Sequence, residues 1–362
     1  MSETSTRLSG QVRVVGAGLL GASIGLGLKS QGLDVILADI SPANLSLAID
    51  YGAGRAARAD DEPAIVVVCV PPDLIPSVVR AELDAYPRAI VTDVASVKGL
   101  PLEELRSNGA ELSRYVGSHP LAGRERGGAI SARADLFIGR PWVICPRPGL
   151  ARAEISAVEA MILDLGATPV EMETSAHDAA VALVSHTPQI VSSLMAKRLV
   201  SSSDSALGIT GQGLRDVTRI AASQPELWVQ ILGANATAVV EILRAYRSDL
   251  DRVIETLTDP SAPGARRALA EELAEGNAGV SRLPGKHGQD RRYSRLVVMV
   301  DDKPGQLGRL FGELGEIGVN IEDFRMEHSP EAQFGLAEIL VLPEAEQRAI
   351  EDLTERGWRL AG

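Results

Sequence analysis

The chain has 362 residues, of which 36 are Lys or Arg and 48 are Asp or Glu, so its net charge is -12. This length predicts two or three domains. The acidic excess argues against nucleic acid and against anionic membranes as partners. We find no signal-peptide pattern and no run near the ~18 apolar residues of a membrane span, so we expect a cytoplasmic protein.

The two cysteines, Cys69 and Cys145, each lie inside an apolar run. This setting is typical of small buried hydrophobic side chains. It does not indicate a disulfide framework, and we predict no metal site.

Strand and helix patterns alternate over the first ~140 residues. One helix is expected over Leu20–Gln31, and Ser41-Pro42 is an N-cap followed by a first-turn proline. Such alternation predicts a parallel α/β sheet, in a domain spanning residues 1–148. The expected strands are Val12–Val15, Asp34–Ala38, Ile65–Val70, Ala89–Asp93, Tyr115–Gly117 and Trp142–Cys145.

The next segment, residues 149–288, is predicted to be all-α in its main part. Residues 175–200 have helical periodicity around one proline, and residues 225–257 form one long amphipathic pattern. Two such helices expose more apolar surface than one chain can cover, which favours a homodimer. Residues 276–293 contain Gly, Pro and charge without periodicity and are expected to be a linker.

The tail, residues 293–362, is predicted to form a separate small domain. Strand and helix patterns follow in the order β-α-β-β-α, which is typical of a ferredoxin-like α+β fold. The expected elements are strand 294–300, helix 304–317, strands 319–327 and 334–342, and helix 343–357.

A glycine-rich loop follows the first strand. It reads Gly16-Ala17-Gly18-Leu19-Leu20-Gly21 and leads directly into a helix. This G-x-G-x-x-G spacing between a strand and a helix is the fingerprint of a Rossmann-like dinucleotide-binding domain. The cofactor's pyrophosphate would lie at the helix N-terminus.

Asp39 ends the second strand, 18 residues after Gly21. A carboxylate there accepts hydrogen bonds from the ribose hydroxyls of NAD and repels the 2′-phosphate of NADP, at up to ~4 kcal/mol. No Arg or Lys lies between Asp39 and Gly54 to compensate. We therefore predict NAD, although Asp39 could also serve only as a capping acid.

Several further stretches, taken together, resemble the prephenate/arogenate dehydrogenase family of tyrosine biosynthesis. They are VVGAGLLGASIGLGLK, VVVCVPP, VTDVASVKG, GSHPLAGRERGG, VSHTPQIV and GLRDVTRIAASQPELW, in the family's order from about residue 11 to about residue 285. The resemblance implies an NAD-dependent oxidative decarboxylation of prephenate. It also places Val70 and Pro71, in VVVCVPP, at the cofactor.

The resemblance implies that His119, on the loop GSHPLAGRERGG, is the catalytic histidine. A neutral imidazole can remove the substrate hydroxyl proton while hydride leaves for NAD+. Ser96 would hold this histidine or the substrate hydroxyl, or else only cap a helix. Glu125 matches an acid near the site entrance, or is a solvated charge. Arg219 would clamp a substrate carboxylate, unless it forms a structural ion pair.

The stretch VSHTPQIV departs from the family's common S-H-x-P-H pattern, because Gln189 occupies the place of the second histidine. A neutral amide suits the keto acid prephenate better than the ammonium of arogenate, so we favour prephenate. His186 would face the substrate or be a core histidine. His177, at the start of a helix before Asp178, is interpreted as structural.

The tail resembles an ACT domain, a regulatory module that binds amino acids, in VVMVDDKPGQLGRLFGELGEIGVNIEDF. A helix N-terminus and a nearby acid suit an amino-acid zwitterion, and tyrosine is the expected effector. An ordinary turn without a ligand is the alternative. The candidate effector residues are Asp302, Pro304, Gly305, Leu307 and Asn320.

Three other functions remain open. One is an arogenate or dual-specificity cyclohexadienyl dehydrogenase. Another is a β-hydroxyacid dehydrogenase or imine reductase, which would need a lysine or an acid on the interdomain helix. Residues 175–195 contain no lysine. The third is a nucleotide sensor without activity, which would not need His119, Ser96 and Arg219 together.

Overall fold

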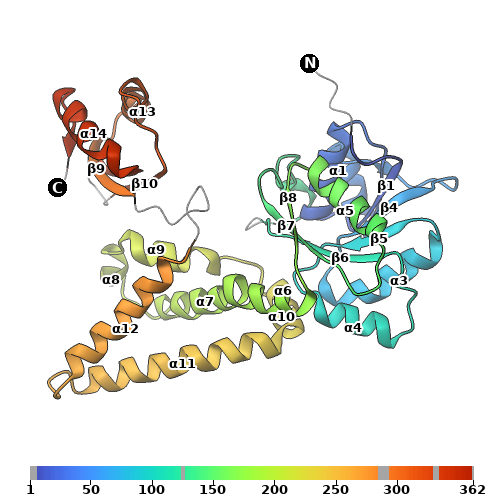
Figure 1. Cartoon of the computed structure of the whole chain (residues 1–362), viewed down its shortest axis with the longest axis horizontal. Coiled ribbons are helices and arrows are strands. Elements are labelled where there is room, and N and C mark those ends of the chain that lie inside the picture. Colours follow the sequence, from blue (N-terminus) through green and yellow to red (C-terminus); the bar gives the residue numbers. More distant parts are fainter. Residues whose placement is uncertain (1–5, 124–126, 284–292, 329–333, 361–362) are drawn as a thin grey trace. The chain divides into compact units, whose positions relative to one another are not determined.

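The computed structural model describes residues 6–123, 127–283, 293–328 and 334–360 (Figure 1). The chain divides into two compact units. One contains Met1–Ser202 and Val217–Tyr246, and the other contains Ser203–Asp216 and Arg247–Gly362.

The first unit is built on one eight-stranded sheet with the strand order β3-β2-β1-β4-β5-β6-β7-β8. The helices α1 (Leu19–Ser30), α2 (Pro42–Asp50), α3 (Ile75–Ala85), α4 (Gly99–Ser107) and α5 (Arg152–Asp164) connect its strands, with short 3-10 turns η1 (Pro72–Leu74) and η2 (Ala129–Ser131). The strands are β1 (Gln11–Val15), β2 (Val35–Ala38), β3 (Arg55–Ala56), β4 (Pro63–Val68), β5 (Ile90–Asp93), β6 (Tyr115–Pro120), β7 (Pro141–Cys145) and β8 (Thr168–Glu171).

The expectation of a wholly parallel sheet is wrong at one edge. Strands β1 to β6 are parallel, but β7 pairs antiparallel with β6, and β8 runs parallel to β7. A parallel return needs a crossover element, usually a helix. Between β6 and β7 the described residues contain only η2.

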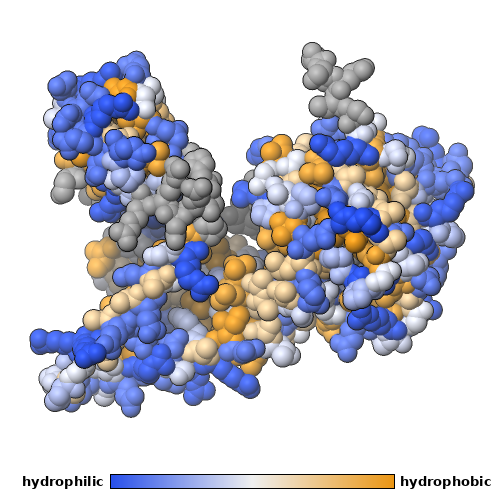
Figure 2. Space-filling view, in the orientation of Figure 1, coloured by the Kyte–Doolittle hydropathy of each residue, from blue (hydrophilic) through white to orange (hydrophobic). Residues whose placement is uncertain are grey.

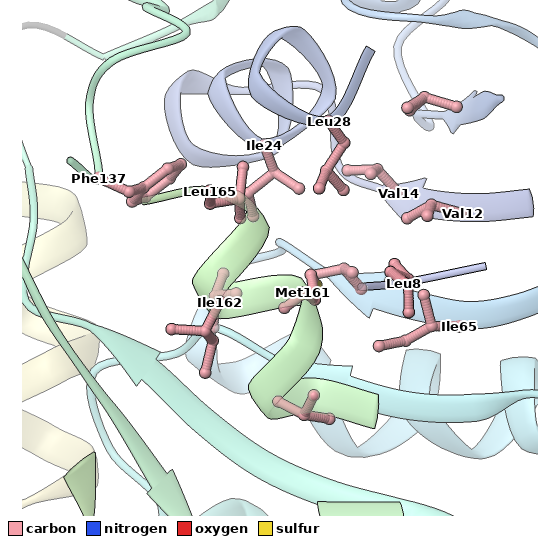
Figure 3. Packing of buried hydrophobic residues seen from close by; sticks show 14 of the residues in the cluster. Leu8, Val12, Val14, Ile24, Leu28, Ile65, Phe137, Met161, Ile162 and Leu165 are labelled. Atoms are coloured by element: carbon pink, nitrogen blue, oxygen red, sulfur yellow. The ribbon is translucent and has the colours of Figure 1, made fainter. Parts of the chain in front are cut away.

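The sheet also continues past residue 148, where the sequence placed the end of the first domain. β8 pairs with β7, and α5 packs into the same core as α1. Figure 3 shows Met161 and Ile162 of α5, and Leu165 directly after it, in the same cluster as Ile24 and Leu28 of α1. All five are at most 3% exposed, and burying such a side chain contributes about 1.5–3 kcal/mol.

Small features of the first unit agree with the sequence. Ser41 caps α2, because its hydroxyl accepts a hydrogen bond from the Asn44 amide at 3.3 Å. Neither cysteine forms a disulfide. Burial raises the pKa of the Cys145 thiol to about 12 and also raises the pKa of Cys69, so both thiols are uncharged.

The helical segment begins with a nearly continuous rod. It consists of α6 (Thr174–Val181), a π-helical turn η3 (Ala182–His186) and α7 (Thr187–Leu199). Pro188 has no backbone N–H and cannot complete the α-helical hydrogen bond, which accounts for the widened turn before it. By length and composition alone this rod could cross a membrane, but it carries His177, His186 and Asp178, which form hydrogen bonds with other elements.

The predicted single helix over residues 225–257 is wrong. It is two helices, α10 (Pro225–Ala234) and α11 (Ala236–Thr258), bent by 94° at Asn235. The remaining elements are α8 (Asp204–Gly208), α9 (Gln212–Thr218), the 3-10 turn η4 (Arg219–Ala221) and α12 (Ala265–Val280), which extends into the expected linker.

Large apolar side chains lie exposed on these helices, and Figure 2 shows apolar residues at the surface there. Such surface is unusual for a monomer and typical of an association site. The exposed side chains include Leu194 and Met195 of α7 and Val229 of α10 in the first unit, and Leu250, Ile254 and Leu257 of α11 in the second unit.

The C-terminal part of the second unit has the predicted β-α-β-β-α order and one additional strand. Its four strands form an antiparallel sheet in the order β10-β11-β9-β12, a ferredoxin-like arrangement. The elements are β9 (Ser294–Asp301), α13 (Gln306–Glu316), β10 (Asp323–His328), β11 (Phe334–Val341), α14 (Pro343–Glu355) and β12 (Arg359–Leu360).

Candidate active site

The predicted cofactor and catalytic residues lie along one edge of the large sheet. β1, β4, β5 and β6 are parallel, so their carboxyl ends share that edge. The glycine loop Gly16–Gly21 follows β1, Val70 and Pro71 follow β4, Ser96 follows β5, and His119 lies near the end of β6. In open α/β sheets, ligands bind at the carboxyl ends of the strands.

The glycine loop has the shape that a dinucleotide requires. Gly16 has φ +98°, and a Cβ there would lie 2.3 Å from the Cys69 carbonyl oxygen. A Cβ at Gly21 would lie 1.9 Å from the Gly16 oxygen, whereas a Cβ at Gly18 would meet nothing within 4 Å. The loop is therefore packed closely at both ends, and its backbone is open at Gly18, before the first residue of α1.

Asp39 is tied to this loop. Its carboxylate accepts a hydrogen bond from the Ala17 amide at 2.7 Å and one from the Ser41 amide at 2.8 Å. The side chain is half-buried. A carboxylate can accept about four hydrogen bonds, so Asp39 retains acceptor capacity for ribose hydroxyls.

His119 is part of a strand and not of a loop as the sequence suggested. Pairing with β7 extends β6 to Pro120, with His119 opposite Val143. The half-buried His119 has its Nδ1 2.9 Å from Nε2 of His177, and Nδ1 of His177 is 2.8 Å from Oδ1 of Asp178. His177 is fully buried. His119, His177 and the Asp178 carboxylate thus form one hydrogen-bonded chain.

The surroundings of His119 keep it neutral. Burial lowers the pKa of His119 well below the ordinary value of a histidine, and the positive charge of the nearby Lys98 ammonium lowers it further. A neutral imidazole is the form that accepts a proton.

A buried ion pair lies near the hydrogen-bonded chain of His119, His177 and Asp178. The Lys98 ammonium contacts the Asp93 carboxylate, and both side chains are at most 2% exposed. Asp93 also accepts hydrogen bonds from the Tyr115 hydroxyl at 2.7 Å and from the Ala95 amide at 2.9 Å. Because these partners satisfy the buried carboxylate, the backbone between β5 and α4, which includes Ser96, is firmly held.

His186 belongs to a second hydrogen-bonded chain. The Asn235 side-chain amide donates to the Asp178 carbonyl oxygen at 2.8 Å, and the same nitrogen lies 3.2 Å from Nδ1 of His186. Nδ1 therefore accepts, and His186 carries its proton on Nε2. Burial lowers the pKa of His186 to about 4, against the opposing effect of the Asp178 charge. The His186 and Trp228 rings also pack edge-to-face, with their centroids 6.1 Å apart.

The other predicted substrate residues occupy different settings. Gln189 is 5% exposed, and its amide bonds to Ser193 and Ser223, both at 3.3 Å. Arg219 is exposed on η4, which packs against α7. Among the described residues no hydrogen bond links Ser96 to His119. Glu125 lies outside the described residues.

The candidate effector residues lie in the second unit. Gly305 has φ +88° and precedes the first residue of α13, a conformation that favours glycine. Asp302 and Pro304 are exposed, and Leu307 is half-buried. The Asn320 amide bonds to the Glu322 carboxylate at 2.7 Å.

Two family models match the chain. Residues 24–171 match the nucleotide-binding domain of prephenate dehydrogenase, and residues 173–274 match its dimerization domain. A probable prephenate dehydrogenase of Streptomyces niveus is 33% identical over 353 residues, covering 95% of this chain and 98% of that protein. The chain belongs to the prephenate dehydrogenase family.

Solved structures of the family resemble this member. The prephenate dehydrogenase of Aquifex aeolicus, in complex with hydroxyphenyl propionate and NAD+, has a TM-score of 0.66 at 25% identity, over 76% of this chain and 99% of that one. The arogenate dehydrogenase of Synechocystis has a TM-score of 0.61 at 27% identity, over 74% and 99% of the two chains.

Several residues around His119 do not stand out in the sequence. His177 has the pattern of a structural residue there, and nothing in the sequence distinguishes Lys98, Asp93 or Asn235. The one sequence feature that could have indicated them is the adjacent pair His177-Asp178 near a helix start. Such pairs are too common in proteins to indicate a site. The importance of these residues comes from contacts between residues distant in sequence, such as the 58 positions that separate His119 from His177.

Proposed function

We propose that the chain is an NAD+-dependent prephenate dehydrogenase, which converts prephenate to 4-hydroxyphenylpyruvate with loss of CO2. The observation that carries this proposal is His119, a neutral histidine at the carboxyl edge of the sheet with its Nδ1 engaged by His177. Membership of the family and the glycine loop on the same edge support it.

The cofactor would be held by the glycine loop and by Asp39. Gly16 and Gly21 admit no side chain, Gly18 is open to a pyrophosphate, and Asp39 accepts the ribose hydroxyls. Val70 and Pro71, after β4, complete the edge of this site. NAD+ supplies the hydride acceptor for the ring carbon that carries the substrate hydroxyl.

Side chains of the protein accept the proton of the substrate hydroxyl and bind the substrate carboxylates. His119 takes the hydroxyl proton on Nε2, which typically contributes about 10²–10⁴-fold. Ser96 orients the hydroxyl. Arg219 binds a substrate carboxylate as a bidentate, charge-assisted pair, and Glu125 lies at the entrance. Loss of the ring carboxylate as CO2 then makes the ring aromatic.

Prephenate is the favoured substrate over arogenate. An ammonium in a closed site needs an anionic partner. Gln189 is neutral, and His186, with its pKa lowered to about 4 by burial, is neutral as well. Both can donate a hydrogen bond to a keto acid or a carboxylate.

The test is NADH absorbance at 340 nm with purified protein, NAD+, and either prephenate or arogenate, measured side by side. We expect a larger kcat/KM with prephenate. A larger value with arogenate would make the chain an arogenate dehydrogenase. NADH formation with neither substrate would remove the proposed function.

The chain acts as a homodimer in the cytoplasm. The matched dimerization-domain model and the exposed apolar side chains of α7, α10 and α11 support the dimer. Sedimentation of the purified protein tests it. A monomer at micromolar concentration would contradict the assignment.

The C-terminal part is an ACT-like regulatory domain that binds tyrosine. The ferredoxin-like strand order and the glycine before α13 support this role, with Asp302, Pro304 and Leu307 beside that turn in sequence, whereas Asn320 follows the other end of α13. Deletion of residues 290–362 should leave activity and abolish inhibition by tyrosine. Unchanged inhibition would mean that tyrosine competes at the active site.

A further inference from the structure

The chain from Asp178 through His177 to His119 has a defined direction. An ionised carboxylate can only accept a hydrogen bond, so Nδ1 of His177 must carry the proton in the 2.8 Å contact with Asp178. In a neutral His177, Nε2 is then an acceptor. The 2.9 Å contact with His119 therefore requires a proton on Nδ1 of His119, and Nε2 of His119 is left without one.

This direction requires an ionised Asp178, and hydrogen bonds to its carboxylate stabilise the ionised form. Asp178 accepts hydrogen bonds from the amides of Lys98 at 2.9 Å and Gly99 at 2.7 Å, at the start of α4. Burial alone would raise the pKa of Asp178, but the hydrogen bonds from His177, Lys98 and Gly99 outweigh it, and the pKa is lowered.

Gly99 is part of the same arrangement. A Cβ at this position would lie 2.8 Å from Oδ2 of Asp178. Only glycine therefore lets the carboxylate approach the backbone of α4 this closely. The start of α4 is in turn held by the buried pair of Lys98 and Asp93.

We propose that His177 and Asp178 are positioning residues: Asp178 orients His177, and His177 holds His119 in the tautomer whose Nε2 is free to receive the substrate proton. This inference rests on the proposed role of His119 as the base. Because a neutral histidine in the opposite tautomer presents an N–H to the substrate, it could not act as a base without first rearranging.

Two substitutions separate this role from simple packing. In His177→Gln the side-chain oxygen can still accept a hydrogen bond from Nδ1 of His119. In His177→Leu the buried position is filled, but no acceptor remains. We expect His177→Gln to keep most of kcat and His177→Leu to lose about 10–100-fold, the range known for removing a partner that orients a metal-bound histidine.

Both variants should keep the wild-type KM and the wild-type NAD+ affinity by calorimetry, since neither touches substrate or cofactor. His328→Gln, the same exchange on β10 of the second unit, is the matched control and should retain wild-type kcat. Equal kcat in His177→Gln and His177→Leu, whether normal or lost, would overturn the proposal.

A spectroscopic measurement keeps the proposal testable even if a variant does not fold. In wild-type protein labelled with ¹⁵N-histidine, His119 should show a protonated Nδ1 and an unprotonated Nε2 near neutral pH, assigned by comparison with His119→Asn. A protonated Nε2 would overturn the proposal. This NMR measurement needs no substrate, so its outcome is independent of the kinetic test of the proposed function.

Discussion

His186 should make the protein lose stability in mild acid, and the size of the loss follows from its setting. It is 1% exposed, and burial lowers its pKa from 6.5 to about 4. Above the unfolded pKa both states are neutral. As the pH falls below 6.5, His186 of the unfolded chain binds a proton, whereas the folded protein leaves it neutral. The free energy of unfolding therefore decreases until the pH reaches the folded pKa.

The magnitude can be worked out from the two pKa values. Between about pH 7.5 and about pH 5, a shift from 6.5 to about 4 removes about 2 kcal/mol from the free energy of unfolding. His119 adds to the loss in the same direction, because burial lowers its pKa as well. A comparison with His186→Asn isolates the first contribution, because that variant retains His119.

The assay is urea unfolding followed by circular dichroism, at both pH values, for the wild type and for His186→Asn. The asparagine oxygen can accept the hydrogen bond that Asn235 now donates to Nδ1 of His186. Whatever its absolute stability, the variant should lose about 2 kcal/mol less than the wild type on acidification. An equal loss in both proteins would refute the reasoning, because His186 would then titrate alike in the folded and unfolded states.

Three further predictions concern the active site. His119→Asn should lower kcat by about 10²-fold or more while NAD+ affinity by calorimetry is unchanged, and a near-normal kcat would exclude His119 as the base. Arg219→Gln should raise KM for prephenate by about 10–100-fold with an unchanged Tm, whereas a lower Tm with a normal KM would indicate a structural ion pair. Wild-type kcat/KM should favour NAD+ over NADP+ by up to roughly 10³-fold, from the repulsion of a 2′-phosphate by Asp39, and equal values would contradict that role.

Local signals in the sequence were sufficient for much of the fold. The loop Gly16–Gly21 and the cap at Ser41 depend on contacts within a few residues. Six of the eight strands of the first sheet are visible in the periodicity and type of their own residues. The β-α-β-β-α order of the tail was predicted for the same reason. Asp39 could be singled out because it ends a strand whose position is clear from its own residues, and His119 because the stretch GSHPLAGRERGG resembles the family's motif.

Only the tertiary structure decided what depends on distant partners. β7 runs antiparallel to β6, and the described residues between the two strands contain no crossover helix of the kind that a parallel return needs. The five residues of β7 do not reveal this. The corner at Asn235 interrupts a pattern that is amphipathic from end to end. There the Asn235 side-chain amide bonds to the Asp178 carbonyl oxygen and to Nδ1 of His186, partners that lie 57 and 49 positions away in sequence. His177 is an ordinary residue near a helix start until the fold brings it within 2.9 Å of His119. Periodicity cannot report such contacts, because they join elements whose separation along the chain is unrelated to their separation in space.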